Sequence, residues 1–76
     1  MINPGQSRAA RALLDMSQKQ VSEESCVSLR TIQGFESGER VLQSLAMSAI
    51  VRVYEDRGIV FISENNWRGV KLKIFC

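Results

Sequence analysis

The segment from Val27 to Arg40, "VSLRTIQGFESGER", carries the side chains best suited to chemistry with a partner. Arg30 presents a planar fork of hydrogen-bond donors, and Gln33 presents an amide donor beside an amide acceptor. Such groups suit the recognition of flat, polar molecular edges through paired hydrogen bonds. No nucleophile in the segment has a neighbouring base to activate it, so the segment predicts binding rather than catalysis.

The rest of the chain also argues against an enzyme. It has no histidine and two cysteines, Cys26 and Cys76, so histidine acid–base chemistry and the usual zinc-ligand spacings are missing. A disulfide between these cysteines is possible, but reduced thiols are the simpler expectation. We therefore expect no catalytic residue, no metal and no cofactor, and nothing in the sequence indicates a small-molecule ligand.

Size and charge set broad limits. The 76 residues predict one small domain, and 45% hydrophobic with 24% charged residues is ordinary for a soluble globular chain. The net charge of +2 permits nucleic acid as a partner without requiring it. The N-terminus lacks a secretory signal pattern, and no apolar run approaches the roughly 20 residues that span a bilayer. We expect a cytoplasmic protein without membrane contact.

A first helix is predicted near the N-terminus. Asn3 can cap it, Pro4 suits the first helical position, and Ser7 is a second possible cap. We expect this helix to end at Met16.

A second helix is predicted over residues 17–25. Ser17 can cap it, and Gln20, three residues later, completes a capping box. Val21 is its single large apolar residue. A helix this short with one apolar anchor is not stable alone, so we expect it to pack on its neighbours.

A third helix is predicted inside the segment quoted above. Ser28 can cap it, and Ile32 and Phe35, three residues apart, face the core together. Gly38 can take the left-handed conformation that ends a helix. Leu29 either joins the apolar face or stays at its edge.

A fourth helix is predicted over residues 42–58, with Gly58 at its end. Its apolar face recurs at three- and four-residue steps and consists of Leu42, Leu45, Ala46, Ala49, Ile50, Val53 and Tyr54.

Residues 59–63 and 70–75 are β-prone, and residues 64–69 between them carry turn residues. Apolar and basic residues alternate from residue 70 to residue 74, which predicts a half-buried strand with its lysines in solvent.

The second and third helices are short and separated by a few residues, which is the helix-turn-helix arrangement. From Arg8 to Gly58 the chain resembles the Cro/phage-repressor-type helix-turn-helix family of bacterial and phage transcriptional regulators. The resemblance implies a mainly α fold, a four-to-five-helix lambda-repressor-like DNA-binding domain over residues 1–58. Residues 59–76 are then a C-terminal β-hairpin of the same domain that serves packing or dimerisation.

The matching positions are specific. Gln18 stands at the family's glutamine that opens the second helix, and Arg11 and Glu36 match a pair that forms a salt bridge between helices one and three in many relatives. The four apolar positions that lock the two helices together are Val21, Val27, Ile32 and Phe35.

There are also departures from the family pattern. Ser22 and Ser25 replace usual alanines, and Cys26 stands where relatives have a glycine in the turn, so a non-glycine residue has to adopt a positive φ. Gly34 replaces a longer polar side chain on the DNA face. Either the backbone approaches DNA closely at Gly34, or the neighbouring side chains do most of the reading alone.

The family's docking mode assigns roles to individual residues as expectations. Arg30 suits guanine and Gln33 suits adenine, while Leu29 and Thr31 can touch a thymine methyl group. The expected base contacts are Leu29, Arg30, Thr31, Gln33 and Gly34. The expected phosphate contacts are Ser17, Gln18, Ser28 and Arg40.

Some of these residues have a structural alternative to a role in DNA binding. Leu29 can serve edge packing instead of base contact, and Arg40 can be a plain solvated residue. Cys26 is expected to be an inert turn residue, and Trp67 is expected to cover an apolar edge rather than stack on a base.

The hairpin either packs on the fourth helix or pairs with the same hairpin of a second subunit. A dimer interface would use Phe61, Ile74 and Phe75. The resemblance implies a sequence-specific regulator of double-stranded DNA, a repressor or autorepressor acting as a homodimer on an inverted repeat. The alternative is a protein-interaction module on a helix-turn-helix scaffold, such as an antitoxin-like partner-binding protein.

Overall fold

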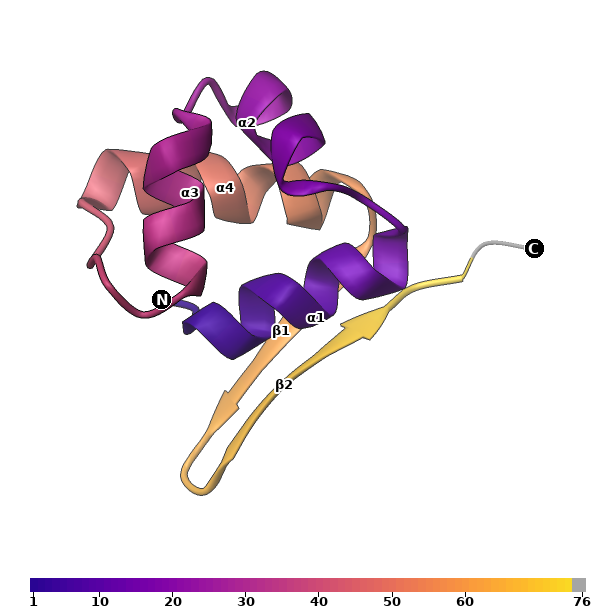
Figure 1. Cartoon of the computed structure of the whole chain (residues 1–76). Helices are drawn as coiled ribbons and strands as arrows, with labels where there is room; N and C mark the ends of the chain where they lie inside the picture. Colours follow the sequence, from indigo (N-terminus) through magenta and orange to yellow (C-terminus); the bar gives the residue numbers. More distant parts are fainter. Residues whose placement is uncertain (75–76) are drawn as a thin grey trace.

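The computed structural model describes residues 1–74. Its elements, in chain order, are α1 (Pro4–Leu14), α2 (Gln18–Ser25), α3 (Leu29–Glu36), α4 (Ser44–Asp56), β1 (Ile59–Glu64) and β2 (Trp67–Leu72). Figure 1 shows α2 and α3 beside α4, with the hairpin running along α1 and its tip extending past the helices. The prediction of four helices followed by a C-terminal hairpin is therefore confirmed.

Local side-chain bonds set the starts of the first two helices. The Asn3 side chain accepts a hydrogen bond from the Gln6 backbone amide at 2.7 Å, and Oε1 of the Gln6 side chain accepts one from the Asn3 backbone amide at 2.9 Å. Ser17 and Gln20 form the same reciprocal pair at the start of α2, as predicted. α1 ends at residue 14, earlier than expected, because Asp15 adopts a left-handed conformation with φ 56°.

The fourth helix differs from its prediction in both start and face. It begins at Ser44, although Leu42 is still buried in the loop before it. The prediction that Leu45 faces the core is wrong, because its side chain is 87% exposed. Met47 is buried instead, and Leu45 lies two residues before it, on roughly the opposite side of the helix.

One apolar core joins all four helices to the first strand. Its buried members are Ile2, Ala10, Met16, Val21, Ile32, Phe35, Leu42, Met47, Ile50, Val53, Tyr54 and Ile59. Two of the four predicted locking residues, Val21 and Ile32, have no exposed surface. α2 and α3 are thus anchored to the rest of the molecule by their inner faces.

The hairpin is longer and its turn shorter than predicted. Pairing continues to Glu64 and Trp67, so the turn consists of Asn65 and Asn66. Residues 67–69, predicted as turn, belong to β2 instead. Trp67 is 70% exposed, so the expectation that it covers an apolar edge is wrong.

The hairpin packs on the helices of its own chain. Gln6 of α1 donates from Nε2 to the carbonyl oxygens of Ile62 at 2.9 Å and Gly69 at 3.0 Å. The ring of Phe61 lies edge-on to Tyr54, with centroids 5.9 Å apart. Phe61, predicted at a dimer interface, therefore packs within its own chain.

The other two residues of the predicted dimer interface lie at the C-terminal end. Ile74 is 79% exposed, and Phe75 lies outside the described residues. No helix within residues 1–74 is both long and apolar enough to cross a bilayer.

Candidate nucleic-acid interface

Side-chain bonds hold the turn between α2 and α3. Ser22 donates from Oγ to the Val27 carbonyl at 2.6 Å, and Ser25 accepts from the Val27 amide at 3.2 Å. Cys26 has φ 61°, which confirms the positive φ predicted for this non-glycine residue. Ser22 and Ser25, which stand where relatives have alanine, thus hold the turn by hydrogen bonds that alanine cannot make.

The first turn of α3 is capped by Ser28. Its Oγ accepts a bond from the Thr31 amide at 3.1 Å and donates to the Thr31 Oγ1 at 2.7 Å. Both residues were predicted to touch DNA, as phosphate and base contacts respectively. In the structure each hydroxyl already has a partner, and Thr31 is half-buried.

α3 has a buried face and a free face. Ile32 is fully buried and Phe35 is 4% exposed, whereas Arg30 and Gln33 point into solvent. Leu29 lies at the margin with 37% exposure, between its two predicted roles. The polar side chains singled out from the sequence are therefore free to meet a partner.

Another side chain fills the space that the missing side chain of Gly34 leaves on α3. Gly34 is buried, because the side chain of Arg40 crosses over it. Around this crossing lies a shallow depression lined by Arg30, Gln33, Gly34, Ser37, Glu39 and Arg40. Arg40, expected at a phosphate, thus shares one surface with the residues expected to read bases.

The carboxylate of Glu36, at the end of α3, is bonded by α1 and α2. Arg11 donates from Nη2 to Oε1 at 2.7 Å and from Nε to Oε2 at 3.0 Å, so the predicted ion pair is present. Gln18 donates from Nε2 to Oε1 at 2.9 Å, and Ser7 donates from Oγ to Oε2 at 2.5 Å. Arg8 also donates to the Glu36 backbone carbonyl.

Tyr54 connects the fourth helix to the same carboxylate. Its hydroxyl lies 2.9 Å from Oγ of Ser7. Because Ser7 has one hydroxyl proton and donates it to Glu36, Tyr54 is the donor in this second bond. One carboxylate thereby joins all four helices and sets where α3 lies.

The ionisation of this cluster follows from its contacts. Burial raises the pKa of Glu36, but hydrogen bonds from Arg11, Ser7 and Gln18 outweigh it and hold the pKa below its ordinary value. The bond to Glu36 raises the pKa of Arg11. Burial also raises the pKa of the Tyr54 hydroxyl, which stays a protonated donor at neutral pH.

Two residues expected at phosphates lie at the start of α2. Ser17 is exposed, and its Oγ accepts a bond from the Gln20 amide at 3.1 Å. Gln18 is half-buried, with its amide nitrogen committed to Glu36. Any phosphate contact at this end would therefore use the exposed hydroxyl and backbone amides of the helix start rather than the Gln18 donor.

Sequence reasoning missed two members of the cluster. The sequence predicted Ser7 only as a second possible cap and Tyr54 only as a member of the apolar face of the fourth helix, yet both are fully buried and joined by a hydrogen bond. The available signal was the four-residue spacing of Ser7 and Arg11, which places both on one face of α1.

α2, the turn and α3 define a helix-turn-helix protein whose second helix keeps a free polar face. Residues 8–56 match the profile of the helix-turn-helix family, which is more than half of the 76 residues. The chain therefore belongs to the Cro/C1-type helix-turn-helix family of DNA-binding regulators, as its resemblance predicted. No curated protein matches it in sequence.

The described residues offer no metal site. Within residues 1–74 no three histidine, cysteine or acidic side chains are grouped so as to hold a metal ion. Cys26 is exposed and carries a free thiol.

Proposed function

We propose that this protein is a sequence-specific regulator of transcription, a cytoplasmic repressor or autorepressor that occupies an inverted-repeat operator as a homodimer. The observation that carries the proposal is the free face of α3. Arg30 and Gln33 extend into solvent from a helix whose opposite side is fixed by Ile32 and Phe35. A helix held in this way can enter the major groove with its reading side chains already placed.

The proposed reading follows from the donors on this face. Arg30 donates a bidentate pair to guanine O6 and N7, and Gln33 pairs with adenine N6 and N7. Leu29 and the Thr31 methyl group are the candidates for thymine contact. Ser17 and Ser28 stand at the exposed starts of α2 and α3, where backbone amides would meet phosphates, joined at Ser17 by the side-chain hydroxyl.

The Glu36 cluster supports this reading because it fixes the recognition helix at its far end. Contacts must be held to within a fraction of an ångström for paired hydrogen bonds to discriminate bases. A carboxylate bonded by three residues from α1 and α2 provides such a hold. In this role the buried ion pair sets orientation more than it adds stability.

Dimerisation in this proposal uses exposed apolar residues of the C-terminal region. Ile74 and Trp67 are 79% and 70% exposed, and Val60 on the outer side of the hairpin is 47% exposed. Two copies joined there would present two recognition helices to one DNA, with half-sites about one helical turn apart. Sedimentation that shows a monomer at high concentration, with and without operator DNA, would contradict this arrangement.

A second candidate function rests on the same exposed apolar residues. In that case the helix-turn-helix is a scaffold and the hairpin is the working surface for another protein, as in an antitoxin-like role. The hairpin tip, which projects beyond the helices in Figure 1, is the observation that favours it.

The deciding experiment is selection of bound duplexes from a random DNA pool, followed by binding of the selected site at several salt concentrations. We expect one enriched sequence with two-fold symmetry and a steep fall of affinity with salt. A pool that stays random, with weak binding that ignores sequence, would favour the protein-interaction module.

A further inference from the structure

The loop after α3 is folded back onto the helix at one carbonyl group. The Gly34 carbonyl oxygen accepts bonds from the Glu39 amide at 2.9 Å, the Arg40 amide at 3.0 Å and the Ser37 Oγ at 3.1 Å. The backbone of Arg40 is thereby fastened beside Gly34, six residues earlier in the chain.

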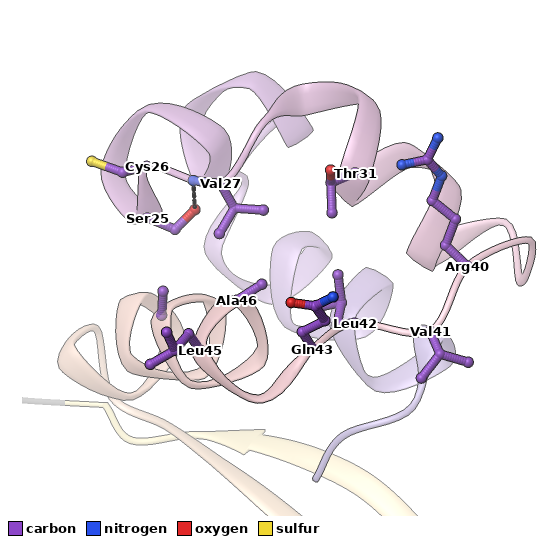
Figure 2. Close-up of a pocket in the computed structure, with 11 residues that line it drawn as sticks. Ser25, Cys26, Val27, Thr31, Arg40, Val41, Leu42, Gln43, Leu45 and Ala46 are labelled. Atoms are coloured by element: carbon purple, nitrogen blue, oxygen red, sulfur yellow. Dashed lines mark hydrogen bonds between the residues drawn. The ribbon is translucent and has the colours of Figure 1, made fainter.

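The missing side chain at position 34 makes room for the Arg40 side chain. A Cβ atom on Gly34 would lie 2.7 Å from the Arg40 Cδ, 2.9 Å from its Cγ and 3.2 Å from its Nε. Separations below 3 Å are steric overlaps, so any other residue at position 34 would push Arg40 aside. In Figure 2 the Arg40 side chain rises along α3, whereas the neighbouring Val41 points the opposite way.

The guanidinium of Arg40 is free among the residues that the structure describes. Arg8, Arg11, Arg57 and Arg68 donate hydrogen bonds, and Arg52 faces Asp56 at 3.9 Å. Within residues 1–74, Arg30 and Arg40 are the arginines whose side chains have no such partner, and they line the same depression on α3. Two guanidinium groups without a partner on the same side of α3 suggest that one ligand binds both.

A carboxylate in the same depression bears on what that ligand is. Glu39 is exposed and lines the depression together with Arg40. Its negative charge opposes a phosphate placed there, whereas the polar edge of a base carries no net charge. The surroundings of Arg40 therefore suit a base edge better than the phosphate expected from the sequence.

On the proposed DNA-binding function, we infer that Arg40 is a specificity-determining residue that reads a base pair in the major groove in place of the side chain that Gly34 lacks. Its guanidinium has the donor geometry for guanine O6 and N7. Gly34 is a positioning residue: because it has no side chain, Arg40 can reach the exposed side of α3. The recognition surface is then built from α3 and the loop that follows it.

The test is pool selection and site-by-site affinity for wild type, Arg40→Ala, Gly34→Ala and the double variant. We expect Arg40→Ala to lose discrimination at one base pair by about 5- to 150-fold while other positions keep theirs. We expect Gly34→Ala to lose part of the same preference, and the double variant to lose no more than Arg40→Ala alone. Arg52→Ala, which removes an exposed arginine on α4, should leave the selected sequence unchanged.

Thermal unfolding of each variant separates binding from folding. Alanine is a better helix former than glycine, so Gly34→Ala should be at least as stable as wild type. The inference is overturned if Arg40→Ala weakens binding equally on all sequences and lowers the salt slope by about one, as for a phosphate contact. It is also overturned if Arg40→Ala changes nothing, or if Gly34→Ala keeps the full preference. A wild-type protein that enriches no sequence would overturn the proposed function together with it.

Discussion

Nη2 of Arg11 lies 2.7 Å from Oε1 of Glu36, and this ion pair joins the last turn of α1 to the end of α3. The glutamate side chain is 2% exposed and the arginine side chain 20% exposed. Charges this far from water are costly unless every lone pair is used. No buried side-chain nitrogen or oxygen in the described residues lacks a hydrogen-bond partner.

Arg11→Met should destabilise the protein because it leaves the Glu36 carboxylate buried without its cation. We expect a loss of about 3 kcal/mol in the free energy of unfolding, the lower end for a broken buried pair, because Arg11 keeps some exposure. Chemical denaturation at neutral pH measures it. Arg52→Met is the control, since its partner Asp56 is 72% exposed, and its loss should stay below about 1 kcal/mol. Equal losses in both variants would contradict the role given to the buried pair.

Stability should fall in acid through Glu36. Its hydrogen bonds depress the folded-state pKa, so its contribution is full above the ordinary carboxyl pKa and is lost as pH falls through the depressed value. Unfolding free energies from about pH 6 to pH 2 should therefore decline. Glu36→Gln has no charge to lose, so its stability should decline less over the same range. Parallel pH profiles for the two proteins would show that other carboxylates govern the acid transition.

Features that depend on residues close together in the sequence were predicted correctly. The caps at Asn3, Ser17 and Ser28 are local hydrogen bonds, and all three are present. The left-handed conformation of Cys26 was predicted from the family resemblance, because relatives have a glycine at this position of the turn. The paired locking residues Ile32 and Phe35 follow from helical spacing.

What the sequence could not supply are contacts between distant segments. The bonds of Gln6 to the hairpin join residues more than fifty positions apart. The sequence around Gln6 indicates only its local role in capping α1. Leu45 has the spacing of a core residue, but the packing of α4 turned it outward in favour of Met47. Arg40 reaches Gly34 because the loop folds back, which residue types alone do not reveal.

Cys26→Gly should stabilise the protein. Cys26 is held at φ 61°, a conformation that costs a residue with a Cβ about 1–2 kcal/mol and glycine almost nothing. Part of this gain is offset by the greater freedom of glycine in the unfolded chain, so we expect a net gain of about 0.5–1 kcal/mol. Cys26→Ser keeps the Cβ and should show no gain. If serine stabilised as much as glycine, the thiol rather than the backbone would be the cause.

Gln6→Ala should loosen the hairpin. The substitution removes two hydrogen bonds to strand carbonyls along with the capping box, at a cost of about 1–3 kcal/mol. Hydrogen exchange should show that the substitution speeds up exchange, relative to wild type, more for the amides of residues 59–72 than for those of α4. Gln20→Ala is the matched control, because it removes a capping box without touching the hairpin. Hairpin amides that stay equally protected in both variants would contradict this role for Gln6.

Arg30→Ala should weaken binding to the selected operator by about 1–3 kcal/mol and relax the preference at one base pair. The exposed guanidinium at the start of α3 has no partner among the described residues, so its donors are available to a base edge. Arg30→Lys is the discriminating variant, because lysine keeps the charge and loses the paired geometry. A base contact predicts that lysine weakens the preference, whereas a phosphate contact predicts that lysine keeps most of the affinity and all of the preference. Affinities for the operator and for its single-base-pair variants, measured at one salt concentration, decide between the two.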